Sequence, residues 1–153
     1  MHLRSTDISR RAGLGAALAV LAAALAPRMA QATPEAVAAE LQKLYADKSF
    51  GEGRVKLDIP EIAENGSLVP LNIDVASPMT EADFVRTVHV FADGNPLPRV
   101  VTYRFTPACG RAAASIRMRL AQTQNVLCVA EMSDGSLFSA KAQIKVTVGG
   151  CGG

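Results

Sequence analysis

Short runs of β-forming residues fill the chain from residue 55 to residue 148, and this pattern constrains the fold more than any other feature of the sequence. Glycine, proline, asparagine and aspartate, which favour turns, separate the runs. Such spacing is typical of an all-β domain. We expect seven strands, at residues 55–59, 68–75, 84–92, 99–105, 113–120, 125–132 and 138–148.

Apolar and polar residues alternate within several of these runs. Ile116, Met118 and Leu120, for example, are separated by two arginines. Because successive side chains of a strand point to opposite faces of the sheet, each such strand has one buried face and one wet face. The pattern predicts an immunoglobulin-like antiparallel β-sandwich.

One helix is expected ahead of the strands. Thr33 followed by Pro34 is typical of a helix start. Apolar residues then recur at helical spacing from Val37 to Tyr45. We therefore predict a helix at about residues 34–47, in a single domain that spans residues 33–148.

Residues 1–32 are interpreted as a twin-arginine signal peptide. Arg10 and Arg11 precede a modestly apolar, alanine-rich stretch, and a small-x-small cleavage site ends at Ala32. Arg28, close to that site, favours export of a folded protein. The alternatives are an ordinary secretory signal and a membrane anchor, and alanine contributes little to membrane insertion. We expect a periplasmic protein without membrane insertion.

Removal of this segment changes the charge of the protein. The whole chain has 16 Lys and Arg and 14 Asp and Glu, and loss of four arginines and one aspartate leaves 12 and 13, a net charge of about −1. Nucleic acids bind proteins with a surplus of clustered basic residues. The mature chain lacks such a surplus, so no nucleic-acid partner is expected.

Three cysteines, Cys109, Cys128 and Cys151, would enter an oxidising compartment. An odd number leaves at least one thiol unpaired. Cys109 lies in a predicted turn and Cys128 in an apolar run, so either these two form a disulfide or Cys128 is a small buried hydrophobe. In both cases Cys151 is left as a thiol.

The chain ends in a Gly-Gly-Cys-Gly-Gly sequence, residues 149–153, which follows the last predicted strand directly. Glycine removes side-chain bulk and adds conformational freedom, so we expect a flexible arm that presents Cys151 to another protein. No helix start or neighbouring cation lowers the thiol pKa locally. Activation of the thiol would therefore come from a partner, and the chain would be a carrier. The four arm glycines are Gly149, Gly150, Gly152 and Gly153.

No catalytic or metal-binding constellation is evident. His89 is the one histidine after residue 32, and its position in an alternating run favours a surface or cross-strand residue. The sequence has neither an HExxH nor a CxxC motif. We expect no metal site and no cofactor other than sulfur intermediates bound covalently to Cys151.

Several segments of the mature chain resemble the SoxY family of sulfur carriers of thiosulfate oxidation. The terminal Gly-Gly-Cys-Gly-Gly sequence is the most specific of them. The others are Lys145-Val146-Thr147-Val148, Leu57-Asp58-Ile59-Pro60-Glu61-Ile62-Ala63-Glu64-Asn65-Gly66, Phe91-Ala92-Asp93-Gly94-Asn95-Pro96 and Ala130-Glu131-Met132-Ser133-Asp134-Gly135.

This resemblance implies a heterodimer with SoxZ, a second β-sandwich that is exported with its partner. It also implies that residues 149–153 are a swinging arm. A cytochrome would join thiosulfate to Cys151, a hydrolase would release sulfate, and a sulfane dehydrogenase would oxidise the remaining sulfur. We also expect the edge of the last strand, with Lys145 and Thr147, to contact SoxZ.

Other functions fit parts of the sequence. A SoxY-like carrier could serve a periplasmic dehydrogenase, or the chain could be a thiol redox module. A ubiquitin-like carrier activated at its terminal glycines would need cytoplasmic ATP, which the leader argues against. A structural sandwich with an incidental tail is the remaining alternative.

Overall fold

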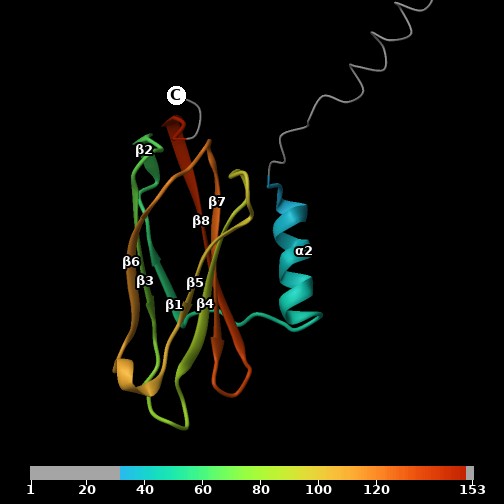
Figure 1. The fold of residues 1–153 in the computed structure, drawn as a ribbon, viewed down its shortest axis with the longest axis vertical. Coiled ribbons are helices and arrows are strands. Elements are labelled where there is room, and N and C mark those ends of the chain that lie inside the picture. Colours follow the sequence, from blue (N-terminus) through green and yellow to red (C-terminus); the bar gives the residue numbers. More distant parts are fainter. Residues whose placement is uncertain (1–31, 151–153) are drawn as a thin grey trace, which may run out of the picture.

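The computed structural model of the protein describes residues 32–150 and shows two β-sheets packed face to face, with one helix alongside (Figure 1). The predicted β-sandwich is confirmed. The elements, in chain order, are α2 (Pro34–Tyr45), β1 (Val55–Asp58), β2 (Ile62–Asn65), β3 (Val69–Val75), β4 (Val85–Ala92), β5 (Arg99–Arg104), the 3-10 helix η1 (Pro107–Cys109), β6 (Ala112–Met118), β7 (Gln124–Met132) and β8 (Leu137–Val148).

The smaller sheet has the strand order β1-β3-β6 and the larger one β2-β8-β7-β4-β5. All seven predicted strands form, and their ends differ from the prediction by two residues at most. The alternation of β3 shows why the sheets pack together. Val69, Leu71, Ile73 and Val75 are buried between the sheets, while the residues between them face outward.

Strand β2 was not predicted, and it makes the sandwich incompletely antiparallel. It pairs in parallel with the end of β8, with Ile62 opposite Lys145 and Asn65 opposite Val148. Its four residues lack an alternating apolar pattern, since Ala63 is the only buried one. Because β2 pairs with the last residues of β8, this end of β8 is not an edge of the sheet. The expected contact of Lys145 and Thr147 with SoxZ stays a prediction.

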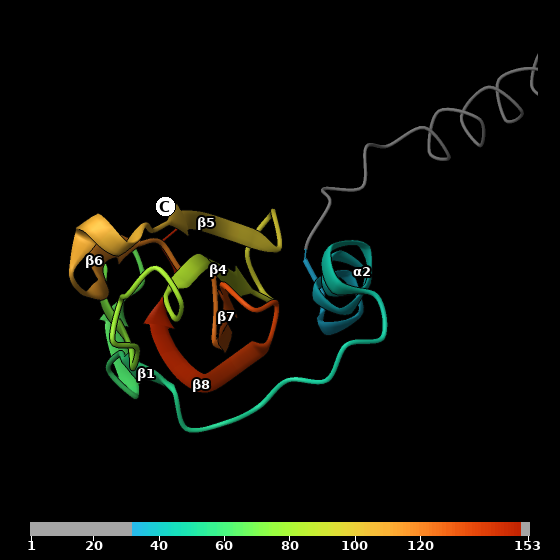
Figure 2. The same cartoon turned by 90° about the horizontal axis from the view of Figure 1, so that it is seen from below.

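Helix α2 covers the outer face of the larger sheet (Figure 2). The Thr33 side chain accepts a hydrogen bond from the backbone N–H of Ala36 at 3.3 Å, which caps the helix start. The helix ends two residues before the predicted end, because Ala46 adopts a positive φ of 50°. Its apolar residues and those of the sheet form a second small core, made of Val37, Leu41, Tyr45, Phe91, Leu127, Val129 and Leu137.

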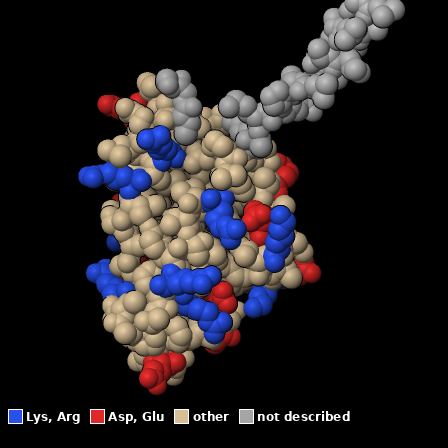
Figure 3. Space-filling model, in the orientation of Figure 1, with Lys and Arg blue, Asp and Glu red and all other residues tan. Residues whose placement is uncertain are grey.

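Within residues 32–150, no helix has the length and apolar character needed to cross a membrane. Figure 3 shows basic side chains in several separate places on one face of the domain, with acidic side chains among them.

Candidate functional site

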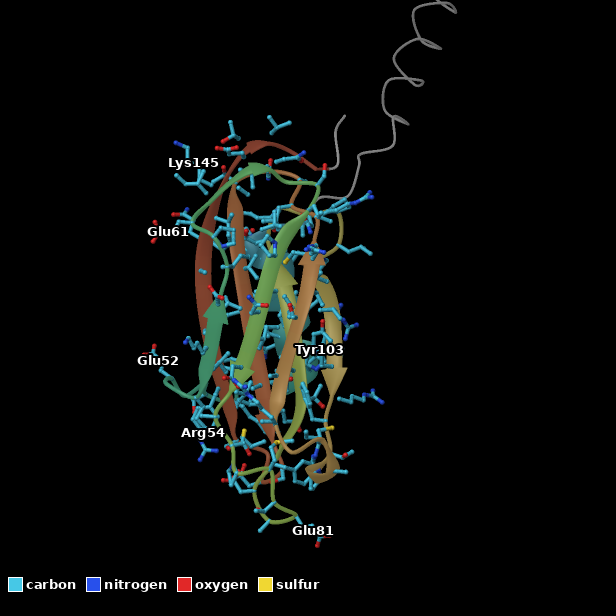
Figure 4. The ribbon with its side chains drawn as sticks, turned by 90° about the vertical axis from the view of Figure 1, so that its left-hand side faces the viewer. Glu52, Arg54, Glu61, Glu81, Tyr103 and Lys145 are labelled. Atoms are coloured by element: carbon cyan, nitrogen blue, oxygen red, sulfur yellow. The ribbon has the colours of Figure 1, made fainter. Side chains whose placement is uncertain are left out.

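The candidate site is the root of the C-terminal arm, where β8 ends. Strand β7 pairs with β8 as far as Ile144, and β2 pairs with the residues that follow, from Lys145 to Val148. The N–H of Lys145 also donates a hydrogen bond to the Glu61 carbonyl at 2.8 Å, and Figure 4 shows both residues near this end of the sandwich. The strand that carries the arm is therefore fixed up to Val148.

Gly66 connects the end of β8 to the loop between β6 and β7. Its N–H donates to the Val148 carbonyl at 2.7 Å, and its carbonyl accepts from the N–H of Leu120 at 2.8 Å. The Leu120 carbonyl in turn accepts from the N–H of Gly150 at 2.9 Å. Three hydrogen bonds thus join the turn after β2, the β6–β7 loop and the first arm residues.

Gly149 and Gly150 pack closely against this surface. A Cβ atom on Gly149 would collide with the Ala121 carbonyl, and one on Gly150 with the Gly66 carbonyl. A Cβ on Gly66 would collide with the Leu120 carbonyl and lie 2.9 Å from the Gly150 nitrogen. We call Gly66, Gly149 and Gly150 the three-glycine contact.

Close approach, and not an unusual backbone conformation, is the reason for glycine at these positions. None of the three residues has a positive φ, whereas Gly53, Gly110 and Gly135 do. In the structure Gly149 and Gly150 lie against the domain, and the expectation that residues 149–153 form a flexible arm stays a prediction.

Two buried amide side chains hold the loop on which the arm root rests. Asn95 and Gln124 are 9% and 4% exposed. The Asn95 side chain donates to the Arg119 carbonyl at 2.8 Å and accepts from the N–H of Ala121 at 3.1 Å and from the Gln124 side chain at 2.9 Å. The backbone carbonyl of Asn95 also accepts from the N–H of Ala32 at 2.8 Å.

Three exposed apolar side chains lie on or beside the elements that meet at this root. Ile62 is 60% exposed, Leu68 64% and Val148 61%. A cavity of about 520 Å³ beside them is lined by Glu61, Ile62, Thr123, Gln143 and Lys145. Exposed apolar side chains that gather at one end of a domain favour contact with another protein.

The cysteine expected to carry sulfur, Cys151, and the glycines Gly152 and Gly153 lie outside the described residues. The root immediately before them consists of backbone amides and carbonyls. Such groups do not titrate near neutral pH, so the three-glycine contact cannot act as a base for a neighbouring thiol.

The other two cysteines are both free, so the disulfide considered between Cys109 and Cys128 is not formed. Cys128 faces the core from β7, and burial raises the pKa of its thiol to about 12. Cys109 is exposed on η1, which Figure 1 shows at the end of the sandwich opposite the arm. A side chain inside the core cannot meet one on that exposed turn.

His89 is a cross-strand residue, as one interpretation of the sequence predicted. It lies opposite Thr102, whose hydroxyl is 2.8 Å from its Nδ1 atom, and its ring packs near Tyr45. Burial, together with Arg99, lowers the His89 pKa. Within residues 32–150, no three His, Cys, Asp or Glu side chains come together as metal ligands.

Sequence reasoning missed Gly66, Asn95 and Gln124 as residues of this site. The sequence identified Gly66 and Asn95 as turn residues, and Gln124 carried no signal. Their contacts join segments that lie far apart along the chain, so no local pattern could have revealed them.

The chain has a family match and a structural match among known proteins. The chain matches the family described as "Sulfur oxidation protein SoxY" over residues 41–151. It is similar to the structure of the sulfur carrier protein SoxY from Chlorobium limicola f thiosulfatophilum, with 26% identity, a TM-score of 0.63, and coverage of 76% of this chain and 100% of the other. No curated protein matches the chain in sequence.

Two other solved structures share the fold alone. A superoxide reductase (neelaredoxin) from Ignicoccus hospitalis has 18% identity and a TM-score of 0.55, covering 75% of this chain and 94% of the other. A putative superoxide reductase from Thermotoga maritima has 17% identity and a TM-score of 0.53, covering 63% and 93%. At such low identity the fold says nothing about a shared activity.

Proposed function

Because the chain belongs to the SoxY family of sulfur oxidation proteins, we propose that it carries sulfur covalently on Cys151 during thiosulfate oxidation. One observation carries this proposal: the family match runs to residue 151 and so includes the thiol that follows the packed arm root. The similarity to a solved sulfur carrier supports the same role. The chain would be a carrier on which other proteins act, not an enzyme.

The chemistry of a thiol suits this task. In the first step a sulfur–sulfur bond forms between Cys151 and the outer sulfur of thiosulfate, the thiol loses its proton, and two electrons pass to a cytochrome partner. A hydrolase partner then adds water, which breaks the bond to the sulfonate sulfur and releases sulfate. A persulfide remains on Cys151, and a sulfane dehydrogenase partner oxidises it further.

The surroundings of the arm root support a division of labour between carrier and partners. The root offers only backbone groups, so an enzyme must bring the base, the electron acceptor or the activated water. Ile62, Leu68 and Val148 are exposed on or beside the elements that meet at the arm root, where such an enzyme would dock. A carrier of this kind can visit several enzymes in turn, because none of the catalytic groups belongs to it.

We further propose that the protein works in the periplasm as a heterodimer with SoxZ. The paired Arg10 and Arg11 support twin-arginine export, a route that accepts a folded complex. Joint replacement of both arginines by lysine should retain the precursor in the cytoplasm. Co-expression with tagged SoxZ should give a complex of one copy of each chain, and recovery of SoxZ alone would refute the pairing.

The central test replaces Cys151 with serine and uses Cys109→Ser as the matched control, since Cys109 is an exposed thiol within the described residues. In a system reconstituted with SoxZ and the partner enzymes, Cys151→Ser should abolish thiosulfate-dependent electron transfer, while Cys109→Ser should leave it unchanged. Mass spectrometry of the C-terminal peptide should show an added thiosulfate or a single added sulfur. Full turnover by Cys151→Ser would refute the proposal.

The same peptide distinguishes the related functions. A disulfide-linked or glutathionylated Cys151 without added sulfur would indicate a thiol redox module. Added sulfur that appears only with a different periplasmic dehydrogenase would indicate a carrier for that enzyme.

A further inference from the structure

We propose that Gly66 is a positioning residue for Cys151. Through the three-glycine contact it fixes the point at which the sulfur-bearing residue leaves the domain. The role given to Cys151 rests on the proposed function. The three-glycine contact does not, because it is a property of the isolated chain.

The first argument is the space available. Each glycine of the contact faces backbone atoms of another segment, and an added Cβ on any of them would approach those atoms more closely than the 3.0 Å that real Cβ atoms respect. A flexible side chain could move aside, but a backbone carbonyl held in a hydrogen bond cannot do so without moving its segment. Alanine at position 66, 149 or 150 should therefore separate the arm root from the domain.

The second argument is that the surface under the contact is itself fixed. Leu120 and Ala121, which meet Gly150 and Gly149, belong to the loop that the buried Asn95 side chain holds. Thr123 ties the same loop to β8, because its hydroxyl accepts from the N–H of Val146 at 2.9 Å. The arm root thus rests on a loop that hydrogen bonds from the β4–β5 connection and from β8 hold in place.

This arrangement shortens the part of the chain that can move. Consecutive Cα atoms are about 3.8 Å apart, so the Cα atom of Cys151 stays within that distance of Gly150. An arm free from Val148 onward would let the same atom move about 10 Å, at roughly 3.3 Å per residue, and sweep an area about sevenfold larger. A fixed root leaves fewer backbone bonds to be ordered when an enzyme takes up the thiol.

The test is amide hydrogen exchange of residue 150, measured by NMR on the isolated protein. In the native chain the hydrogen bond to Leu120 should slow exchange about tenfold relative to a free chain. Gly66→Ala and Gly150→Ala should each remove that protection. Gly152→Ala, the same change in the same arm beyond the contact, should leave it unchanged. The amide of Val90, in the core strand β4, reports whether each variant is folded.

A second measurement follows the cysteine itself. A nitroxide label on Cys151, in a Cys109→Ser background, should move faster in Gly66→Ala than in the native sequence, and equally fast in Gly152→Ala and the native sequence. Equal mobility in all three proteins, or residue-150 exchange at the free-chain rate in the native protein, would overturn the inference. Neither result requires a sulfur enzyme, so failure of the carrier proposal and failure of this one are distinguishable.

Discussion

Replacement of Asn95 by alanine should destabilise the whole domain, although the side chain lies in a loop between two strands. Asn95 is nearly buried and links the β4–β5 connection to the β6–β7 loop. Its amide makes three hydrogen bonds, of 2.8, 3.1 and 2.9 Å, to the Arg119 carbonyl, the Ala121 N–H and the Gln124 side chain. Alanine would remove all three hydrogen bonds and leave these three groups without their Asn95 partner.

The expected loss of unfolding free energy follows from these bonds. A hydrogen bond between neutral groups contributes about 1 kcal/mol net, and a buried group left without a partner costs about 1–3 kcal/mol. Gln124 retains a bond to the Gln122 carbonyl at 3.2 Å, so part of the loss is recovered. We expect a decrease of about 3 kcal/mol, a large part of the roughly 5–15 kcal/mol that stabilises a typical domain.

Urea denaturation of the two proteins measures this difference. With a slope of about 1–3 kcal/mol per molar urea, the midpoint of Asn95→Ala should fall by about 1–3 M. Asn72→Ala is the matched control, because Asn72 bonds to Asp58 and Ser115 on the exposed face of the smaller sheet. Surface changes usually stay within about 0.5 kcal/mol. Equal losses of unfolding free energy in Asn95→Ala and Asn72→Ala would refute the argument that burial makes the Asn95 hydrogen bonds more important.

Three further predictions concern titratable groups. Burial raises the Cys128 pKa to about 12, so in a Cys151→Ser protein a thiol reagent at pH 8 should modify Cys109 in the folded state and Cys128 only after unfolding. Rapid labelling of both thiols in the folded state, counted by mass spectrometry, would contradict the core position of Cys128. Burial and Arg99 lower the His89 pKa, so the unfolded chain binds the proton more readily than the folded one. The free energy of unfolding should therefore fall as the pH decreases below about 6.5. Urea midpoints at several pH values should show this fall, and the fall should be smaller in His89→Gln. The hydrogen bond from Arg111 lowers the Asp74 pKa. The stability that this bond adds is present above about pH 3.9 and is lost as the pH falls through the lowered pKa. In Arg111→Gln an NMR titration should find the Asp74 pKa raised relative to the native protein, and an unchanged pKa would refute the pairing.

Residues with a strong local pattern were predictable from the sequence. The alternation in β3, with Val69 and Leu71 buried, follows from side chains that point to opposite faces in turn. Thr33 and Pro34 marked the start of α2 for an equally local reason, the capping of free backbone N–H groups.

Contacts between distant segments were not predictable in this way. Strand β2 forms because β8 offers it a backbone edge, whereas Ala63, Glu64 and Asn65 have little preference for strands of their own. The glycines of the arm show the same limit. A run of glycines predicts flexibility, yet the same absence of a side chain permits the close approach of Gly149 and Gly150 to Ala121 and Gly66, which no local pattern could show.

The bond from Ala32 to Asn95 has a practical consequence for work with this protein. It brings Ala32 next to the loop that supports Gly150, so the two ends of the described chain lie at one pole of the domain (Figure 1). An affinity tag fused close to Ala32 or at the C-terminus would obstruct the approach of partner enzymes to the arm root. The connection that contains Glu81 lies at the far pole (Figure 4), and an internal tag or surface tether placed there would leave the sulfur end unobstructed.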